Sequence, residues 1–328
     1  MSQHIVLGID GGGTYTRVAA ADVKGKILAF SKYPGSHPGK NQHPDENVKA
    51  AIREVLHQAN TKVSSVECIV GGFAGLNRPE DRKWANEFLN ILGLECVKVV
   101  LNDAHVAQFG AFVGGQGILA IAGTGSIVLG KTDAGSIIRN YDFHHDSAAA
   151  ARYLSYSVIY EIITQKHPVE EQGFIQSVLS YWGTSDIEEF RILASKGFSE
   201  NRVKAIQQLS GMAAFVTSAA SKGSKIAYRA CEKVIDSLVI GINLVASRFP
   251  SIEVPLALIG GVIKDPFMTK LLMDKLDRIK SNHTFSFQAP QLSPVLGAVL
   301  YSYSELGIPV NQEIVDKLKM AEHTNNFQ

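Results

Sequence analysis

Two stretches of the sequence repeat one pattern, in which three short apolar segments are separated by glycine-containing turns. In the first copy the turn after the first segment is Gly11-Gly12-Gly13, and the segments are 5–9, 17–23 and 27–30. In the second copy the corresponding turn is Gly123-Thr124-Gly125, and the segments are 118–122, 127–129 and 137–138. Apolar runs joined by short glycine turns are typical of antiparallel strands, so each copy predicts a three-stranded meander. We interpret the pair as an internal repeat of one supersecondary unit.

Strand and helix patterns alternate in the segments that follow each meander. Single strands are predicted at 66–70, 97–101, 254–259 and 284–287. Helical spacing follows Asp45, which suits an N-cap, and recurs at 78–92, 226–245, 265–279 and 294–303. This alternation predicts an α/β fold. A chain of 328 residues is longer than one hydrophobic core usually serves, and the second copy places the boundary between two domains, 1–113 and 114–328.

Charge and cysteine content exclude several classes of function. The 32 basic and 31 acidic side chains give a net charge of +1, and no nucleic-acid-binding motif is present, so we expect no nucleic-acid partner. The apolar stretches are too short or too interrupted to span a bilayer, and the N-terminus lacks a signal-peptide layout, so we expect a cytoplasmic protein without a membrane partner. The three cysteines form no C-x-x-C pair, which argues against a disulfide framework.

The two glycine-rich turns are candidate phosphate-binding sites. In the first, Asp10-Gly11-Gly12-Gly13-Thr14 directly follows a predicted strand. Glycine lets backbone N–H groups approach an anion, Thr14 adds a hydroxyl donor, and Asp10 could hold Mg²⁺ through water. In the second, Gly123-Thr124-Gly125-Ser126 occupies the equivalent place, so the two turns together could grip a polyphosphate. A plain hairpin turn is the alternative for each.

Three further segments carry polar or glycine residues at predicted strand ends or in loops. Asn102-Asp103 follows a strand, where a carboxylate can take a proton from an attacking hydroxyl, although a helix N-cap is the alternative. Gly260-Gly261 also follows a strand, and could cap a helix or admit an adenine ring. His144-His145-Asp146 invites a metal hypothesis, but adjacent histidines point apart, which favours a loop facing solvent or substrate.

Taken together, these landmarks resemble the BadF/BadG/BcrA/BcrD ATPase and N-acetylglucosamine kinase family of the actin-like sugar kinase superfamily. The resemblance rests on an ordered set of motifs: IDGGGT at 9–14, FAGLNRPED at 73–81, LNDA at 101–104, IAGTGS at 121–126, IGG at 259–261 and PVLGAVLYS at 294–302. It implies two ribonuclease-H-like domains around a nucleotide cleft, with a last helix at about 294–306 able to pack back on the N-terminal domain. It also implies ATP and Mg²⁺ as cofactors, and it allows a homodimer.

The resemblance also implies roles for individual residues. Asp103 matches the catalytic base on the sugar hydroxyl, the turns at 11–14 and 123–126 match those that bind ATP phosphates, and Gly260-Gly261 lies by the adenosine. Gly75, Asn102 and Asp146 match positions near the sugar. The asparagine expected before the first helix has no clear match, and His37 or Asn41 could replace it.

One segment departs from the family pattern. Residues 139–149 lack the tryptophan and glycines of the G-W-G-x-x-x-G-D-E-G-S-like stretch that helps form the sugar pocket, and only Asp146 keeps its place. The leading hypothesis is ATP-dependent phosphorylation of a hydroxyl on a small sugar, such as N-acetylglucosamine or glucosamine. The alternatives are a non-catalytic sugar or nucleotide binder, and an ATPase that activates a partner enzyme, for which the three cysteines do not obviously supply iron–sulfur ligands.

Overall fold

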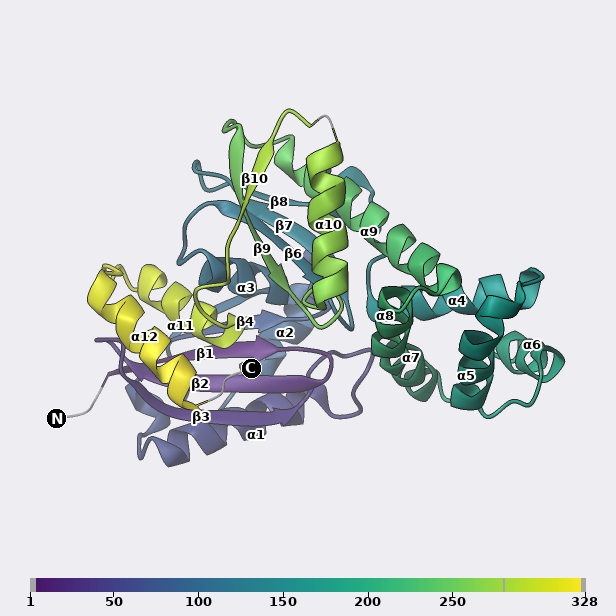
Figure 1. The fold of residues 1–328 in the computed structure, drawn as a ribbon. Helices are drawn as coiled ribbons and strands as arrows, with labels where there is room; N and C mark the ends of the chain where they lie inside the picture. Colours follow the sequence, from purple (N-terminus) through teal and green to yellow (C-terminus); the bar gives the residue numbers. More distant parts are fainter. Residues whose placement is uncertain (1–3, 280, 326–328) are drawn as a thin grey trace. The chain divides into compact units, whose positions relative to one another are not determined.

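The computed structural model describes residues 4–279 and 281–325 (Figure 1). The chain divides into two compact units. Unit 1 contains residues 1–119, 129–137 and 287–328, and unit 2 contains residues 120–128 and 138–286. These limits fall within the second meander, whereas the sequence pattern places the domain boundary at residues 113–114, which stays a prediction.

The first sheet contains β1 (Ile5–Gly11), β2 (Tyr15–Asp22), β3 (Ile27–Pro34), β4 (Val66–Phe73) and β5 (Val97–Asn102), in the order β3-β2-β1-β4-β5. The first three strands pair antiparallel, which confirms the first predicted meander. The other two pair parallel to β1 and to each other. The carboxyl ends of β1, β4 and β5 therefore share one edge of the sheet, where open α/β sheets place ligands.

The second sheet repeats this order. It contains β6 (Gly117–Ala122), β7 (Ser126–Lys131), β8 (Ile137–Arg139), β9 (Glu253–Ile259) and β10 (Thr284–Phe287), in the order β10-β9-β6-β7-β8. Read from the other side, the meander strands occupy the same three places as β3-β2-β1 in the first sheet. The repeat inferred from the glycine turns is thus present in the strand order. Two five-stranded mixed sheets with helices confirm the predicted α/β fold class.

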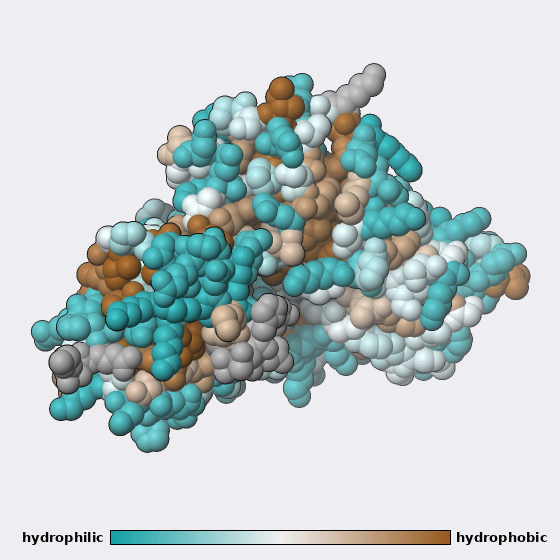
Figure 2. All heavy atoms as spheres, turned by 60° about the vertical axis from the view of Figure 1, so that its left-hand side comes forward, coloured by the Kyte–Doolittle hydropathy of each residue, from teal (hydrophilic) through white to brown (hydrophobic). Residues whose placement is uncertain are grey.

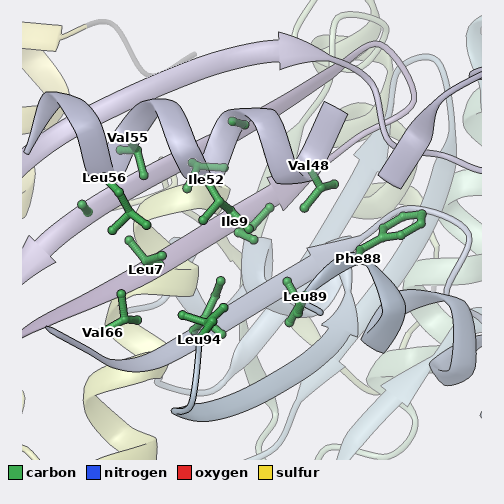
Figure 3. Close-up of a cluster of buried hydrophobic side chains, with 14 of the residues drawn as sticks. Leu7, Ile9, Val48, Ile52, Val55, Leu56, Val66, Phe88, Leu89 and Leu94 are labelled. Atoms are coloured by element: carbon green, nitrogen blue, oxygen red, sulfur yellow. The ribbon is translucent and has the colours of Figure 1, made fainter. Parts of the chain in front are cut away.

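Alternate residues of the first sheet point into two cores in unit 1, as strand geometry requires. Ile5, Leu7 and Ile9 pack against α1 (Pro44–Gln58) and α2 (Arg82–Phe88) in one core (Figure 3). Val6, between them, belongs to the other core, which includes side chains of α3 (Asp103–Ala111), α11 (Pro294–Glu305) and α12 (Gln312–Asn325). Burial on both faces explains why β1 reads as a continuous apolar run.

Helix α11 packs very closely on the sheet because glycines remove side chains at the contact. A Cβ atom on Gly8 of β1 would lie 2.6 Å from the Val295 oxygen and the Val299 nitrogen of α11. A Cβ on Gly297 of α11 would lie 2.2 Å from the Val106 oxygen of α3. The helix predicted at about 294–306 therefore contacts β1, β4 and α3 of unit 1, far from it in sequence.

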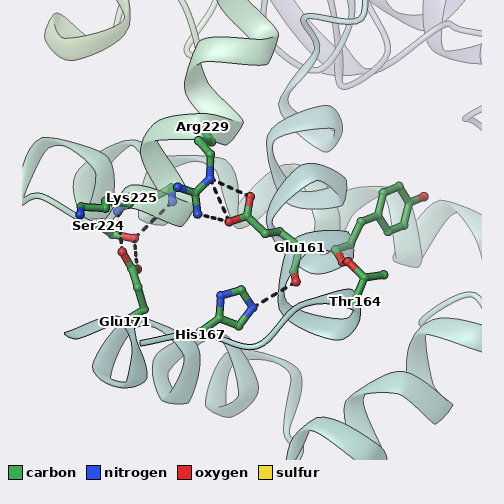
Figure 4. A network of polar contacts seen from close by, with 9 residues as sticks. Glu161, Thr164, His167, Glu171, Ser224, Lys225 and Arg229 are labelled. Atoms are coloured by element: carbon green, nitrogen blue, oxygen red, sulfur yellow. Dashed lines mark hydrogen bonds and ion pairs between the residues drawn. The ribbon is translucent and has the colours of Figure 1, made fainter. Parts of the chain in front are cut away.

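Unit 2 carries most of the helices: α4 (Ala151–Thr164), α5 (Gln172–Trp182), α6 (Ile187–Ser195), α7 (Arg202–Gly211), α8 (Ala213–Ser221), α9 (Lys225–Ala246) and α10 (Pro266–Arg278). Buried carboxylates join some of them (Figure 4). Glu161 of α4 pairs with Arg229 of α9, and Glu171 accepts hydrogen bonds from the Ser224 hydroxyl and the Lys225 N–H at the start of α9. These contacts fix α4 and the 169–172 segment against α9.

Two predicted element boundaries were wrong. Helix α1 begins at Pro44, so Asp45 lies in its first turn and His43 takes the N-cap position. The helix predicted at 78–92 is a 3₁₀ turn, Pro79–Asp81, followed by the short α2. The cause is local, because the Asp81 carboxylate accepts the N–H groups of Asn77 and Arg78 and so favours a turn there.

Surface apolar residues occur as separate groups among hydrophilic ones on the face that Figure 2 shows. The most exposed large apolar side chains, Leu92, Val169 and Ile252, come from widely separated parts of the chain. Single exposed apolar residues of this kind are normal. None of the helices in residues 4–279 and 281–325 is long and apolar enough to cross a membrane.

Candidate functional site

The first glycine turn joins β1 to β2 as a tight hairpin. The Gly12 N–H donates to the Tyr15 carbonyl at 2.9 Å. Gly11 is buried, and a Cβ there would lie 2.5 Å from both the Phe73 ring and the Ser36 hydroxyl. Gly12, Gly13 and Thr14 remain accessible. The hairpin alternative is therefore correct for the backbone, and accessible amides at its tip leave the turn able to bind an anion.

The loop at 35–41 packs over this turn and brings a cation to it. The Ser36 N–H donates to the Gly12 carbonyl at 3.0 Å, and the Asn41 side-chain amide donates to the Gly13 carbonyl at 3.3 Å. A Cβ atom on Gly13 would lie 3.4 Å from the Lys40 ammonium nitrogen. Lys40 was not among the predicted site residues, and Asn41, predicted near the substrate, uses its amide N–H groups to hold this loop.

Asp10 lies at the end of β1, opposite Arg17 of β2 in the strand register. The Arg17 Nη1 donates to its carboxylate at 3.3 Å, and burial raises the pKa of Asp10 against the opposing effect of this guanidinium. The Arg17 Nε is buried without a hydrogen-bond partner in the described chain. An unsatisfied donor beside a buried carboxylate fits a site that takes a further acceptor.

Asn102 and Asp103 have different positions at the start of α3. Asn102 is the N-cap, because its Oδ1 accepts the Ala104 N–H at 2.9 Å, and its amide donates to the Leu76 carbonyl at 3.2 Å. Asp103 is the first residue of the helix. The alternative in which Asp103 is only an N-cap is therefore wrong, since Asn102 has that role.

Asp103 lies beside Asp10 at the shared edge of the sheet. Gly72 pairs with Asp10 in the register, and a Cβ on Gly72 would lie 3.3 Å from the Asp103 Cα. Burial, and next the charge of Asp10, raise the pKa of Asp103 to about 7, while Lys40 acts to lower it. A carboxyl poised near neutral pH is suited to accept a proton.

The third strand end at this edge carries Gly75. Its φ of +92° favours glycine, and a Cβ there would lie 3.1 Å from the His37 Nε2. The His37 Nδ1 accepts the Gly39 N–H, and burial lowers the pKa of this imidazole. Unit 1 therefore brings together Asp10, the first turn, Lys40, Gly75, Asn102 and Asp103, all but Lys40 from the predicted set.

The second glycine turn lies against the Gly260-Gly261 turn within unit 2. The Gly123 N–H donates to the Gly125 carbonyl at 2.9 Å, closing the hairpin between β6 and β7. Gly260 has a φ of +109°, and a Cβ there would lie 2.3 Å from the Ala122 oxygen. Because Asp265 is the N-cap of α10, the suggestion that Gly260-Gly261 caps that helix is wrong.

Residues 139–149 contact the second glycine turn. The Ser147 and Ser126 hydroxyl oxygens lie 2.7 Å apart, and the Tyr141 hydroxyl donates to the Ser126 carbonyl at 2.8 Å. Ser147 is buried in the left-handed conformation, with a φ of +43°. Asp146 is exposed beside it. The segment is thus attached to a candidate phosphate-binding turn of the same unit.

Neither histidines nor cysteines form a metal centre in the described ranges. No group of three or more His, Cys, Asp or Glu side chains that could hold an ion occurs within 4–279 and 281–325. His145 instead accepts the Ser147 N–H through its Nδ1, and Cys68, Cys96 and Cys231 are free thiols.

Comparison with known proteins supports the resemblance inferred from the motifs. A sequence model of the BadF/BadG/BcrA/BcrD ATPase family matches residues 7–302, which confirms that resemblance. An N-acetylmuramic acid/N-acetylglucosamine kinase of Clostridium acetobutylicum is 34% identical over 146 residues, 43% of this chain and 46% of that protein. An N-acetyl-D-glucosamine kinase of Dictyostelium discoideum is 35% identical over 148 residues, 40% of this chain and 44% of that protein. The matches span less than half the length of these relatives.

Solved structures share the fold over nearly the whole chain. A proposed N-acetylglucosamine kinase from Chromobacterium violaceum has a TM-score of 0.71 at 22% identity, covering 92% of this chain and 99% of that one. A ROK family glucokinase from Streptomyces griseus, solved with glucose and AMPPNP, has a TM-score of 0.57 at 16% identity, covering 91% and 98%. At these identities the likeness concerns the fold.

Proposed function

Because the chain belongs to the BadF/BadG/BcrA/BcrD ATPase family, we propose that it transfers the γ-phosphoryl group of ATP to a hydroxyl of an amino sugar, such as N-acetylglucosamine or glucosamine. The observation that carries the proposal is the edge of the first sheet. There a carboxyl with a pKa of about 7, Asp103, lies beside Asp10 and the first glycine turn. The relatives that match part of the chain are named as N-acetylglucosamine kinases, which supports an amino sugar as the substrate.

Asp103 is the proposed general base. Its carboxylate accepts the proton of the sugar hydroxyl while that oxygen forms a bond to the γ-phosphorus and ADP leaves. The position of Asp103 at the start of α3 supports this role, because Asn102 caps the helix and the Ala104 N–H also donates to the Asp103 Oδ1 at 3.0 Å. Asn102 also holds the Gly75 loop through the Leu76 carbonyl.

The proposed phosphate-binding groups come from both glycine turns, Gly11–Thr14 and Gly123–Ser126, with Gly260 and Gly261 beside the adenosine. Lys40 joins them as the cation nearest Gly13. The charge of Asp10 raises the pKa of Asp103, and neighbouring carboxyls suit a cation, so Asp10 is the residue we propose to hold Mg²⁺ through water. Bound Mg²⁺ would neutralise charge on the phosphates.

The proposed acceptor residues are Gly75 and Asn102 in unit 1 and Asp146 in unit 2. His37 is a better candidate than Asn41 for the missing asparagine, because its Nε2 faces Gly75 whereas the Asn41 amide N–H groups already bind the Gly13 and His37 carbonyls. The unusual 139–149 segment supports a changed preference among amino sugars.

The test is ADP release with ATP, Mg²⁺ and a panel of amino sugars, with mass spectrometry of the product. We expect one or more sugars to gain a phosphoryl group, and Asp103→Asn to abolish the gain. Sugar-independent ATP hydrolysis would support the partner-activating ATPase, and binding of ATP and sugar without turnover would support the non-catalytic binder. We also propose a cytoplasmic location, because the proposed reaction uses ATP. A homodimer stays a prediction, which light scattering of the purified chain would test.

A further inference from the structure

A cavity in unit 1 is lined by none of the residues assigned to the reaction. Its volume is about 460 Å³, within the range of small-molecule sites. Its walls come from α3 and the turn after it, from the adjoining ends of β7 and β8 with the turn between them, and from α11 with the segment that follows it. The chemically distinctive side chains are His105, Phe109, Lys131, Tyr301, Ser304 and Glu305. Aliphatic side chains such as Val113, Leu300 and Val310 complete the walls.

Lys131 supplies a half-buried cation to this cavity. Its ammonium donates to the Gly114 carbonyl at 2.5 Å and lies 5.1 Å from the centre of the Phe109 ring. Within 4–279 and 281–325 no carboxylate forms an ion pair with it, and burial lowers its pKa. An ammonium has three donors, so this group retains the capacity to bind an anion, which would offset its burial.

An aromatic cluster forms a second part of the wall. The Tyr301 ring centre lies 4.8 Å from that of Phe109 and 5.8 Å from that of His105. Burial keeps both groups neutral near pH 7, because it raises the pKa of Tyr301 and lowers that of His105 to about 4. Glu305, exposed beside Tyr301 on α11, is the negative charge that lines the cavity. It could accept a hydrogen bond from a hydroxyl or amino group.

We propose that this cavity binds a small organic anion. Its carboxylate or phosphate would contact Lys131, and its body would pack against the side of the cavity that the contacting Phe109 and Tyr301 rings form. A carboxylate with an aromatic body and a phosphorylated sugar share this chemistry. The proposal goes beyond the proposed kinase activity and does not depend on it.

Calorimetric titration of the full chain with benzoate, glucosamine 6-phosphate and inorganic phosphate tests the proposal. The first two probes distinguish an aromatic carboxylate from a sugar phosphate. The third, inorganic phosphate, tests whether an anion binds without an organic group attached to it. We expect at least one organic probe to bind at millimolar concentration or tighter. Lys131→Met should weaken that binding about tenfold or more, because a charge-assisted hydrogen bond is lost. Lys83→Met is the matched control, since Lys83 is an exposed lysine on α2 of the same unit.

A second variant guards against misfolding of Lys131→Met. Ser304→Trp places a large side chain at the exposed rim of the cavity and leaves Lys131 in place, so it should also weaken binding while the thermal midpoint is retained. The proposal is overturned if no probe binds, or if both folded variants bind as well as the unmodified chain. Binding lost only in Asp103→Asn would assign the probe to the reaction site and would overturn it too.

Discussion

The hydroxyl oxygens of Ser126 and Ser147 lie 2.7 Å apart and join the second glycine turn to the segment that departs most from the family pattern. Ser147 holds this position in a left-handed conformation, at φ +43°, which a non-glycine residue adopts at a cost. The Tyr141 hydroxyl adds a second contact to Ser126. The segment therefore contacts a proposed phosphate-binding turn, and it also contains Asp146, a proposed acceptor residue.

Ser147→Ala is expected to raise the KM for ATP by about twofold to tenfold, the usual effect of losing one neutral hydrogen bond of about 0.5–1.5 kcal/mol. The KM for the sugar should change less. Steady-state kinetics with each substrate varied in turn measures both constants. Ser180→Ala, at an exposed serine of α5, is the control. Equal effects on both KM values would contradict a specific role at the nucleotide turn.

Gly260→Ala tests whether the turn beside Gly123 needs glycine. The φ of +109° and the 2.3 Å approach to the Ala122 oxygen both oppose a Cβ, so we expect a loss of about 1–3 kcal/mol or more in the free energy of unfolding. Gly261→Ala is the matched control, because no atom lies within 4 Å of its Cβ position. Denaturant unfolding compares the two, and equal stabilities would show that the turn relaxes around the new methyl group.

The sequence was sufficient for those parts of the fold that depend on local patterns. The strand before Asn102 and the long helix α9 have regular spacing of apolar residues, and the glycine turns are marked by their residue types. Such local patterns can be recognised from the sequence alone. The starts of α1 and α2 were predicted less well. There Pro44 and the Asp81 carboxylate decide the backbone, and competition between side-chain and helical hydrogen bonds is not visible in periodicity.

Lys40 is the site residue that sequence reasoning missed, and the reason is physical. It lies in an irregular loop whose path is fixed by contacts with residues far away in the chain, such as the bond from Asn41 to Gly13. The only signal was its place in a Gly- and Pro-rich loop between a meander and a helix. The contact between Ser126 and Ser147 likewise joins residues that are 21 positions apart, so the sequence pattern around either one does not predict it.

Lys40→Gln is expected to weaken ATP binding about tenfold, because it removes a cation beside Gly13. It should also move the acid limb of the rate profile to higher pH, because Lys40 lowers the pKa of Asp103. Nucleotide titration and pH-dependent kinetics measure the two effects. Lys83→Gln should change neither. If ATP affinity weakened but the acid limb of the pH–rate profile did not move, Lys40 would have no electrostatic effect on Asp103.

The pH dependence of kcat/KM should report the ionisation of Asp103. Only the carboxylate form accepts a proton, so activity should fall about tenfold per pH unit on the acid side of its pKa of about 7. The ordinary value for an aspartate, 3.8, would give a limb about three units lower. A profile that stays flat down to pH 5 would exclude a base with the raised pKa.

Asp103→Asn separates the role of this residue in rate from its role in stability. The carboxyl has a higher pKa in the folded chain, about 7, than its ordinary value of 3.8, so the stability it contributes is present at low pH and is lost as pH rises through 7. The neutral asparagine should therefore stabilise the fold at pH 8 by about 1–2 kcal/mol after solvent screening is allowed for, and should have little effect at pH 4. The same change should lower kcat by about 10²–10⁴ with ATP affinity nearly unchanged.

Asn102→Ala provides the contrast for this prediction. It removes the helix N-cap of α3, so it should destabilise the fold by about 0.5–2 kcal/mol at both pH values. Replacing a residue that acts through folding alone lowers stability and activity together. Replacing a buried catalytic carboxylate raises stability while it lowers kcat. An Asp103→Asn protein that is more stable at pH 8 and still turns over at the original rate would remove Asp103 from the mechanism. Because Asp10 is the neighbouring carboxyl whose charge raises the pKa of Asp103, it would then be the next candidate for the base.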